Sequence, residues 1–209
     1  QDKIISTGGE GGMVTTNNEA LWRKMWAYKD HGKSYEAIYE HEKPLGFPWV
    51  HESFGTNWRM TEMQAAIGSI QLKRMDDWHA KRLLNAHRIW NTAKKLKGLR
   101  VPDLSDYIEH AAYKCYVFIN PSQLKLEWDR DKIIMEIRSL GVPCLLGSCS
   151  EVYLEKAFDN RVFKPKKRLP NAKELGDTSL MFLVHPTLTK LEVQKTCDAI
   201  ILVMGLATI

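Results

Sequence analysis

Residue types capable of chemistry gather in two short stretches of the chain. In the first, Lys3 precedes the glycine-rich run Gly8-Gly9-Glu10-Gly11-Gly12, and an apolar stretch follows it. Glycine at this density indicates a backbone with positive φ angles or a group held very close to the chain. A lysine beside such a turn can act as a nucleophile once its ammonium has lost a proton. The alternative is an exposed lysine next to a flexible glycine loop.

The second stretch is Gly55-Thr56-Asn57-Trp58-Arg59-Met60, which runs into a predicted helix start at Thr61. Free backbone N–H groups at a helix N-terminus, an asparagine amide and an arginine fork can converge on phosphate oxygens. Asn57 can equally be a simple turn or cap residue, and Arg59 can form a surface ion pair. Neither side chain identifies a phosphate site by itself.

The sequence around these stretches predicts the elements that position them. Met13–Thr16 is expected to form a short strand that closes the glycine turn. Asn17 or Asn18 can cap a helix that runs to about Asp30, and His31-Gly32 is predicted to end it. Residues 33–56 predict a long irregular segment whose many aromatic residues are expected to pack against something, a second subunit included.

From Thr61 apolar residues recur at helical spacing as far as Gly98, with a kink expected near Asp76-Asp77. The chain is therefore expected to divide into three parts: 1–60, the incomplete end of a larger domain; 61–98, a linking helix; and 99–209, a small C-terminal domain. Strands and helices are intermixed in the last part, which predicts an α+β lobe with two to four strands covered by helices on one face. Its expected strands lie at 111–119, 142–146 and 180–184, and its expected helices lie at about 129–138, 151–158 and 171–177 and after Thr189.

Composition narrows the classes of function. The chain has 209 residues, of which 44% are hydrophobic and 26% charged, and this is ordinary for a globular protein. It shows neither an apolar run long enough to cross a bilayer nor a signal peptide, so we expect a cytoplasmic protein without a membrane partner. The net charge of +5 comes from dispersed basic residues, which argues against nucleic acid. Four cysteines without C-x-x-C spacing predict reduced thiols, and no metal site is expected.

Taken in order, the two stretches resemble those of the pyridoxal-phosphate-dependent sugar aminotransferases, the DegT/StrS-type branch of the aspartate-aminotransferase fold. The turn Ser6–Gly12 is one residue longer than the commonest form in that family. Asp30-His31-Gly32 and Leu183–Thr189 are weaker echoes of the same family. The resemblance implies an α/β fold, the C-terminal part of a fold type I enzyme, with a long spine helix followed by a small α+β lobe.

The same resemblance implies transfer of an amino group, usually from glutamate, to a keto-sugar attached to a nucleoside diphosphate, for polysaccharide or antibiotic sugar biosynthesis. It makes Lys3 the residue that carries pyridoxal 5'-phosphate as a Schiff base. In a homodimer with shared active sites, Asn57 would reach the cofactor phosphate of the neighbouring subunit and Arg59 its nucleotide-sugar. His31 is assigned to substrate binding by the resemblance, although it can equally complement the helix dipole at a C-cap.

In this family the acidic partner of the pyridine nitrogen, the stacking aromatic residue and the phosphate-binding helix end all precede the lysine. We therefore expect this chain to be a fragment, inactive alone. Two alternatives remain: a dehydratase-like relative, which would lack the lysine, and a non-catalytic dimerisation or regulatory module of the same fold. Residues 141–153 depart from the family pattern, so the resemblance assigns no sugar contacts there.

Overall fold

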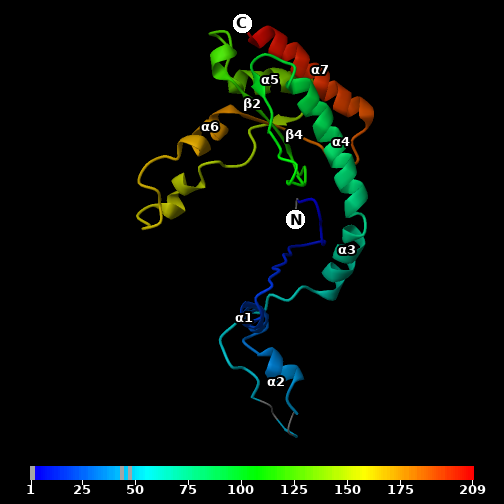
Figure 1. The fold of residues 1–209 in the computed structure, drawn as a ribbon, viewed down its shortest axis with the longest axis vertical. Helices are drawn as coiled ribbons and strands as arrows, with labels where there is room; N and C mark the ends of the chain where they lie inside the picture. Colours follow the sequence, from blue (N-terminus) through cyan, green and yellow to red (C-terminus); the bar gives the residue numbers. More distant parts are fainter. Residues whose placement is uncertain (1–2, 43–44, 47–48) are drawn as a thin grey trace. The chain divides into compact units, whose positions relative to one another are not determined.

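The computed structural model describes residues 3–42, 45–46 and 49–209. Its chain forms two compact units, Gln1–Met75 and Asp76–Ile209 (Figure 1). The boundary between them falls inside the stretch that the sequence predicts as one linking helix. The three-part division at residues 60 and 98 stays a prediction.

Polar caps set the start of each helix in the described part of the first unit. Helix α1 spans Glu19–Lys29, and the Asn18 side chain accepts a hydrogen bond from a backbone N–H of its first turn. Helix α2 spans Tyr35–Tyr39, inside the segment that the sequence predicts as irregular. Helix α3 spans Glu62–Leu72 and begins with a reciprocal capping box between Thr61 and its third residue. The predicted caps of α1 and α3 are thereby confirmed.

Aromatic rings and an ion pair hold α1 against α2. The ring of Tyr35 lies 5.2 Å from the ring of Trp22 and 5.4 Å from that of Trp26, measured between centroids. Arg23 of α1 pairs with Glu36 of α2. Part of the aromatic segment 33–56 therefore packs inside its own unit.

The predicted linking helix is two helices rather than one. Helix α4 spans Met75–Ala93, and Lys73 and Arg74 separate it from α3. At the break the Arg74 N–H donates to the Gln71 carbonyl at 3.0 Å, a bond to the third residue back that tightens the last turn of α3. The interruption comes just before the position where the sequence predicts a kink.

A four-stranded antiparallel sheet lies at the centre of the second unit, in the order β1-β2-β4-β3. The strands are β1 (Leu99–Arg100), β2 (Cys115–Ile119), β3 (Cys144–Leu145) and β4 (Ser179–Phe182). The register places Val117 opposite Leu180 and Cys144 opposite Phe182. The three predicted strands are present but shorter than expected, and the sequence analysis missed β1.

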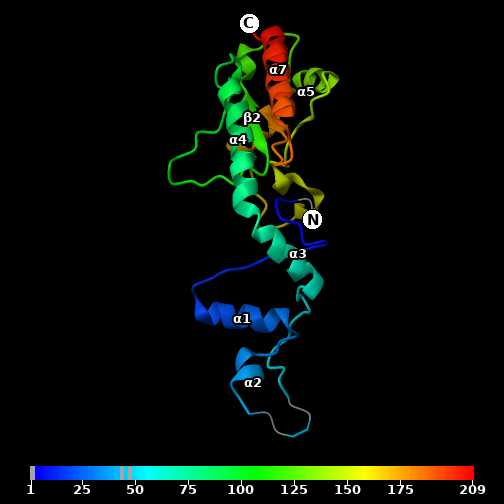
Figure 2. The ribbon, with the colours of Figure 1, turned by 90° about the vertical axis from the view of Figure 1, so that its right-hand side faces the viewer.

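Helices α4, α5 (Arg130–Ser139) and α7 (Lys190–Ala207) pack their apolar faces on the sheet and form the core. Figure 2 shows α7 alongside α4, and α5 also contacts α7. Helix α6 (Pro170–Thr178) contacts β2 and lies on the other side of the sheet in Figure 1. Ile137, Phe182 and Ile200 are fully buried in this core.

Two expected elements are wrong in detail. Met13–Thr16 is not a strand, because no other strand of the described residues pairs with it, and a strand needs a partner for its backbone groups. The helix predicted at 151–158 is two short 3₁₀ segments, Val152–Leu154 and Lys156–Phe158. Glu155 separates them because its backbone is extended, with φ −60° and ψ 141°.

All four cysteines are free thiols, as the sequence predicts. Cys115, Cys144 and Cys197 are buried in the second unit, and Cys149 is exposed. Burial raises the pKa of Cys144 to about 12 and also raises the pKa of Cys115. Both thiols are therefore protonated at neutral pH, and their role is to fill the core.

Candidate functional site

Two segments of the first unit that are distant in sequence meet at the end of α1. Asp30 and Asn57 form an antiparallel bridge between them. Beside the bridge, the His31 N–H donates to the Thr56 carbonyl at 2.9 Å. The chain between these segments is long, so their pairing brings the second chemical stretch to the C-terminal end of α1.

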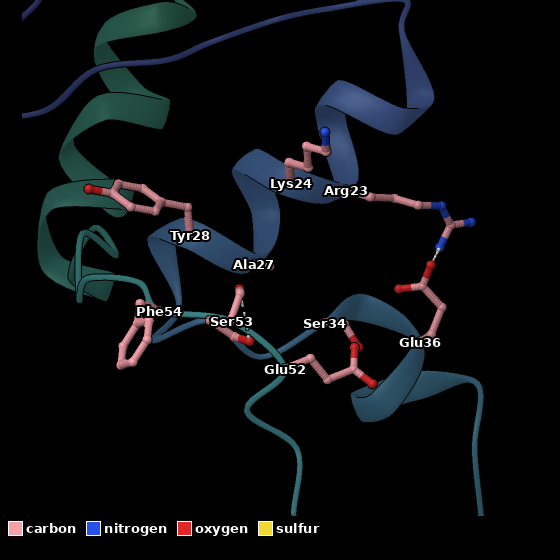
Figure 3. Close-up of a pocket in the computed structure, with 10 residues that line it drawn as sticks. Arg23, Lys24, Ala27, Tyr28, Ser34, Glu36, Glu52, Ser53 and Phe54 are labelled. Carbon is pink, nitrogen blue, oxygen red and sulfur yellow. Dashed lines mark hydrogen bonds and ion pairs between the residues drawn. The ribbon is translucent and has the colours of Figure 1, made fainter.

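Two glycines allow the segments to approach this closely. Gly32 has φ 82°, and a Cβ atom there would collide with the Ser53 carbonyl. A Cβ atom on Gly55 would lie 2.5 Å from the Gly32 nitrogen and 2.6 Å from the Tyr28 carbonyl. Figure 3 shows Ser53 crossing close to the end of α1. The predicted role of Gly32 at the helix end is thus confirmed, and a role for Gly55 is added.

The Arg59 guanidinium joins three other side chains. Its Nε donates to Asn57 Oδ1 at 3.0 Å, its Nη1 lies 3.3 Å from Asp30 Oδ1, and its Nη2 lies 3.5 Å from His31 Nε2. Three of the predicted site residues, His31, Asn57 and Arg59, therefore meet in one cluster.

Asp30 is the member of the cluster that the sequence analysis assigned no role. Its side chain is 13% exposed, and its Oδ1 is buried without accepting a hydrogen bond of good geometry. Arg59 at 3.3 Å and Lys33 at 4.0 Å supply the positive charge around it. The one sequence indication was its position directly before His31-Gly32, at the predicted helix end.

The glycine turn that follows Lys3 lies against α3. The Ser6 N–H donates to Gln71 Oε1 at 2.9 Å, and Gln64 Nε2 donates to the Glu10 carbonyl at 2.9 Å. A Cβ atom on Gly9 would lie 2.5 Å from Gln64 Nε2, so a larger residue there would displace the Gln64 side chain. Gln64 thus serves both the turn and the capping box of α3.

Helix α3 is the element common to the two chemical stretches. Arg59 lies two residues before its N-cap, Thr61, and the glycine turn lies along its side. Lys3 is exposed at the start of that turn. The contacts among His31, Asn57 and Arg59 are direct, whereas Lys3 is related to them through the helix that supports both.

Two hollows adjoin this region of the first unit. The one in Figure 3 has a volume of about 430 Å³ and lies beside α1. Arg23 pairs with Glu36 at its wall, whereas the Lys24 side chain is directed away from Glu36 and Ser53. The other, of about 900 Å³, has a largely apolar wall that includes Met13, Trp22 and Trp58. In the described residues, no three His, Cys, Asp or Glu side chains come together to hold a metal ion.

Comparison with known proteins places this geometry in context. Residues 1–201 match the model of the DegT/DnrJ/EryC1/StrS aminotransferase family, a family that depends on pyridoxal phosphate. GDP-perosamine synthase of Caulobacter vibrioides is 35% identical over 146 residues, which are 68% of this chain and 34% of the relative. The chain spans about half the length of the curated relatives that it matches over most of its own length.

Solved structures share the fold. An aminotransferase from Psychrobacter cryohalolentis superposes with a TM-score of 0.93 and 62% identity, over 98% of this chain and 54% of that one. NtdA from Bacillus subtilis, solved with the cofactor PMP bound, gives a TM-score of 0.73 at 20% identity over 91% of this chain and 41% of that one. These matches confirm the predicted α/β aminotransferase fold at about half of its full length.

Proposed function

Since the chain belongs to the DegT/DnrJ/EryC1/StrS aminotransferase family, we propose that the complete protein transfers an amino group from glutamate to a nucleotide-linked keto-sugar. The observation that carries the proposal is the cluster of His31, Asn57 and Arg59, in the same unit as Lys3. The name of the Caulobacter relative, GDP-perosamine synthase, supports a nucleotide-linked sugar as substrate. Sugar or polysaccharide biosynthesis is the proposed setting.

The chemistry of these residues fits pyridoxal 5'-phosphate. Lys3 offers an exposed primary amine that can react with an aldehyde. Asn57 keeps both amide N–H donors, because its oxygen is taken by Arg59, and amide and guanidinium donors suit phosphate oxygens. The proposed assignments are Lys3 as the covalent attachment point, Asn57 at the cofactor phosphate of the neighbouring subunit, Arg59 at the sugar nucleotide of that subunit, and His31 in substrate binding.

Each residue then has a defined task. When bound, pyridoxal phosphate would supply an electron sink for the bonding change at the α-carbon of the donor. The Lys3 amine would accept the proton from that α-carbon and would later return a proton to the acceptor carbon of the keto-sugar. Asn57 and Arg59 fix the phosphate groups so that the reacting carbon stays within reach of the amine. The Glu10 carbonyl, bonded to Gln64, keeps the lysine turn on α3.

We also propose that this chain is a fragment and inactive alone. Its span of about half of its relatives supports this, because the other cofactor contacts expected for the family would lie in the remainder. A homodimer with shared active sites and a cytoplasmic location belong to the same proposal, the latter on the strength of the four free thiols. No helix among the described residues is long and apolar enough to span a membrane.

The decisive experiment is chemical reduction of the complete protein with borohydride, followed by peptide mapping. We expect the cofactor to be recovered on Lys3 and the absorbance of the bound cofactor to change on addition of glutamate. Lys3→Ala should abolish both results, while Lys73→Ala, a change at another exposed lysine of the same unit, should leave them intact. A folded wild-type protein that takes up no cofactor would favour the dimerisation or regulatory module instead.

A further inference from the structure

Arg59 is held on its inner side and open on its outer side. Its side chain is 46% exposed, whereas the Asp30 carboxylate that it approaches is 13% exposed. Burying a carboxylate is costly unless a positive charge compensates it. Because Asp30 Oδ1 accepts no well-formed hydrogen bond, charge attraction is what ties it to the guanidinium.

The three contacts of Arg59 leave some of its N–H groups able to bind a ligand. The Nε–H donates to Asn57 Oδ1, Nη1 lies 3.3 Å from Asp30 Oδ1 without a well-formed hydrogen bond, and Nη2 lies 3.5 Å from His31 Nε2. Each terminal nitrogen carries two N–H groups, so both keep a donor for a ligand, and such a pair can bind two oxygens of one phosphate. Asn57 is constrained in turn, because its oxygen faces Arg59 Nε and its NH₂ group is left to donate elsewhere.

We infer that Asp30 is a positioning residue: its buried charge orients Arg59, and through Arg59 the Asn57 amide, so that both present ordered donors to phosphate. The inference rests on the proposed function for the identity of the ligand, a phosphate of the cofactor or of the sugar nucleotide. Asp30 thereby joins the site, and its negative charge is needed to hold Arg59.

The charge of Asp30 also has a second effect on anion affinity, opposite in direction to the ordering of Arg59. A carboxylate beside an anion site also repels the anion, so removing its charge can tighten binding. An unrestrained arginine, in contrast, loses rotamer freedom when it binds, which weakens binding. Asp30→Asn keeps the shape of the side chain and removes its charge, and the direction of the change therefore separates the two effects.

The experiment measures binding of inorganic pyrophosphate to the cofactor-free complete protein by calorimetry. Because loss of the ordering costs about 1 kcal/mol or more of arginine entropy, we expect Asp30→Asn to weaken binding about five- to tenfold. Lys33→Met removes the other cation near Asp30 without touching Arg59, and should leave binding unchanged. Unchanged or tighter binding in Asp30→Asn, or no binding in the wild type, overturns the inference.

A double-mutant cycle tests whether Asp30 acts through Arg59. Arg59→Met should weaken pyrophosphate binding more than Asp30→Asn, and adding Asp30→Asn to Arg59→Met should cause no further loss. Additive losses would mean that Asp30 acts in some other way. If Asp30→Asn does not fold, Asp30→Glu takes its place, because it keeps the charge but displaces it and must also weaken binding.

Turnover gives an independent check that a general loss of structure would not imitate. In the complete enzyme, Asp30→Asn should raise KM for the sugar nucleotide about tenfold and leave kcat within about twofold. Equal losses in kcat and kcat/KM would contradict a positioning role. If Lys3 labelling fails but pyrophosphate binding depends on Asp30 as described, the proposed function falls while the phosphate site stands.

Discussion

Apolar side chains are buried throughout the second unit and almost nowhere in the first. Among the described residues up to Met75, Ala27 is the one buried apolar residue, at 9% exposed. In the second unit the sheet and three helices close around Ile137, Phe182 and Ile200, each fully buried. Burial of apolar surface is the dominant favourable contribution to folding, so the second unit has an internal source of stability that the first lacks.

Directional contacts hold the first unit instead. These are the helix caps, the pairing of residues 30–33 with 51–57, tilted and edge-to-face aromatic contacts, and ion pairs. At the same time its helix α3 has no buried residue, and Met63 and Ile70 are 77% and 54% exposed. The residues proposed for chemistry thus lie in a unit whose described part has almost no buried apolar residue, which agrees with an active site completed by the rest of a longer protein.

The two units should differ most in their thermal unfolding when each is produced separately. Residues 76–209 should unfold cooperatively on heating, because their core lies within the fragment. Residues 1–75 should show no cooperative transition, because Ala27 is the one buried apolar residue in the described part of this range. Calorimetry and near-ultraviolet circular dichroism measure both, and a sharp transition in the fragment 1–75 would remove the distinction drawn between the units.

A matched pair of isoleucines tests the same difference residue by residue. In the 209-residue chain, Ile200→Ala should cost about 2–5 kcal/mol, because it leaves a cavity at a fully buried position. Ile70→Ala, at a side chain 54% exposed, should change stability by less than about 0.5 kcal/mol. Chemical denaturation followed by circular dichroism measures both free energies of unfolding.

The same exposed isoleucine sharpens the comparison in the complete protein. If the remainder of the enzyme covers α3, Ile70→Ala should there cost more than about 1 kcal/mol. Equal small costs in the fragment and in the complete protein would show that the apolar face of α3 stays in contact with water.

The sequence predicted the parts of the fold that depend on local contacts. Asn18 and Thr61 each cap a helix as expected, because a cap bonds to backbone only two or three residues away. Elements that need a distant partner were less predictable. The strand expected at Met13–Thr16 has no partner among the described residues, and β1 exists because it pairs with β2.

The candidate site divides in the same way. His31, Asn57 and Arg59 were found because they belong to recognisable stretches of sequence, and their meeting agrees with a shared role. Asp30 was missed because its role exists only after residues 30 and 57 pair across a long connection. Gly55 must be glycine because a Cβ atom there would meet the backbone of Gly32 and Tyr28, and such a contact between distant segments leaves no local sequence pattern.

That pairing can be tested through Gly55. Gly55→Ala places a Cβ atom against the backbone of Gly32 and Tyr28, so the two segments must separate. We expect a local loss of more than about 1 kcal/mol, seen as faster hydrogen exchange at the Thr56 and Trp58 amides. Gly12→Ala is the control, because a Cβ atom there meets nothing within 4 Å. Unchanged exchange in Gly55→Ala would mean that the pairing does not depend on this close approach.

The smallest effect is expected at a charge pair of the second unit that resembles Asp30 and Arg59. The Glu151 carboxylate is 12% exposed and pairs with Arg168, which is 50% exposed; Tyr153 also donates to it, at 2.6 Å. The hydrogen bond from Arg168, followed by that from Tyr153, lowers the pKa of Glu151 from 4.5 to about 2. The resulting stabilisation is present above pH 4.5 and is lost as the pH falls toward about 2.

Glu151→Gln should therefore reduce the fall in melting temperature between pH 5 and pH 2.5, while Glu136→Gln, at an exposed position of α5, should not. The change should be small, because the core that holds the second unit together includes neither Glu151 nor Arg168. The first unit has no such core among its described residues, so the matching change at Asp30 should disturb its surroundings more. If Glu151→Gln instead unfolded the second unit at neutral pH, charge pairs would be as important there as in the first unit, and the contrast between the two would fail.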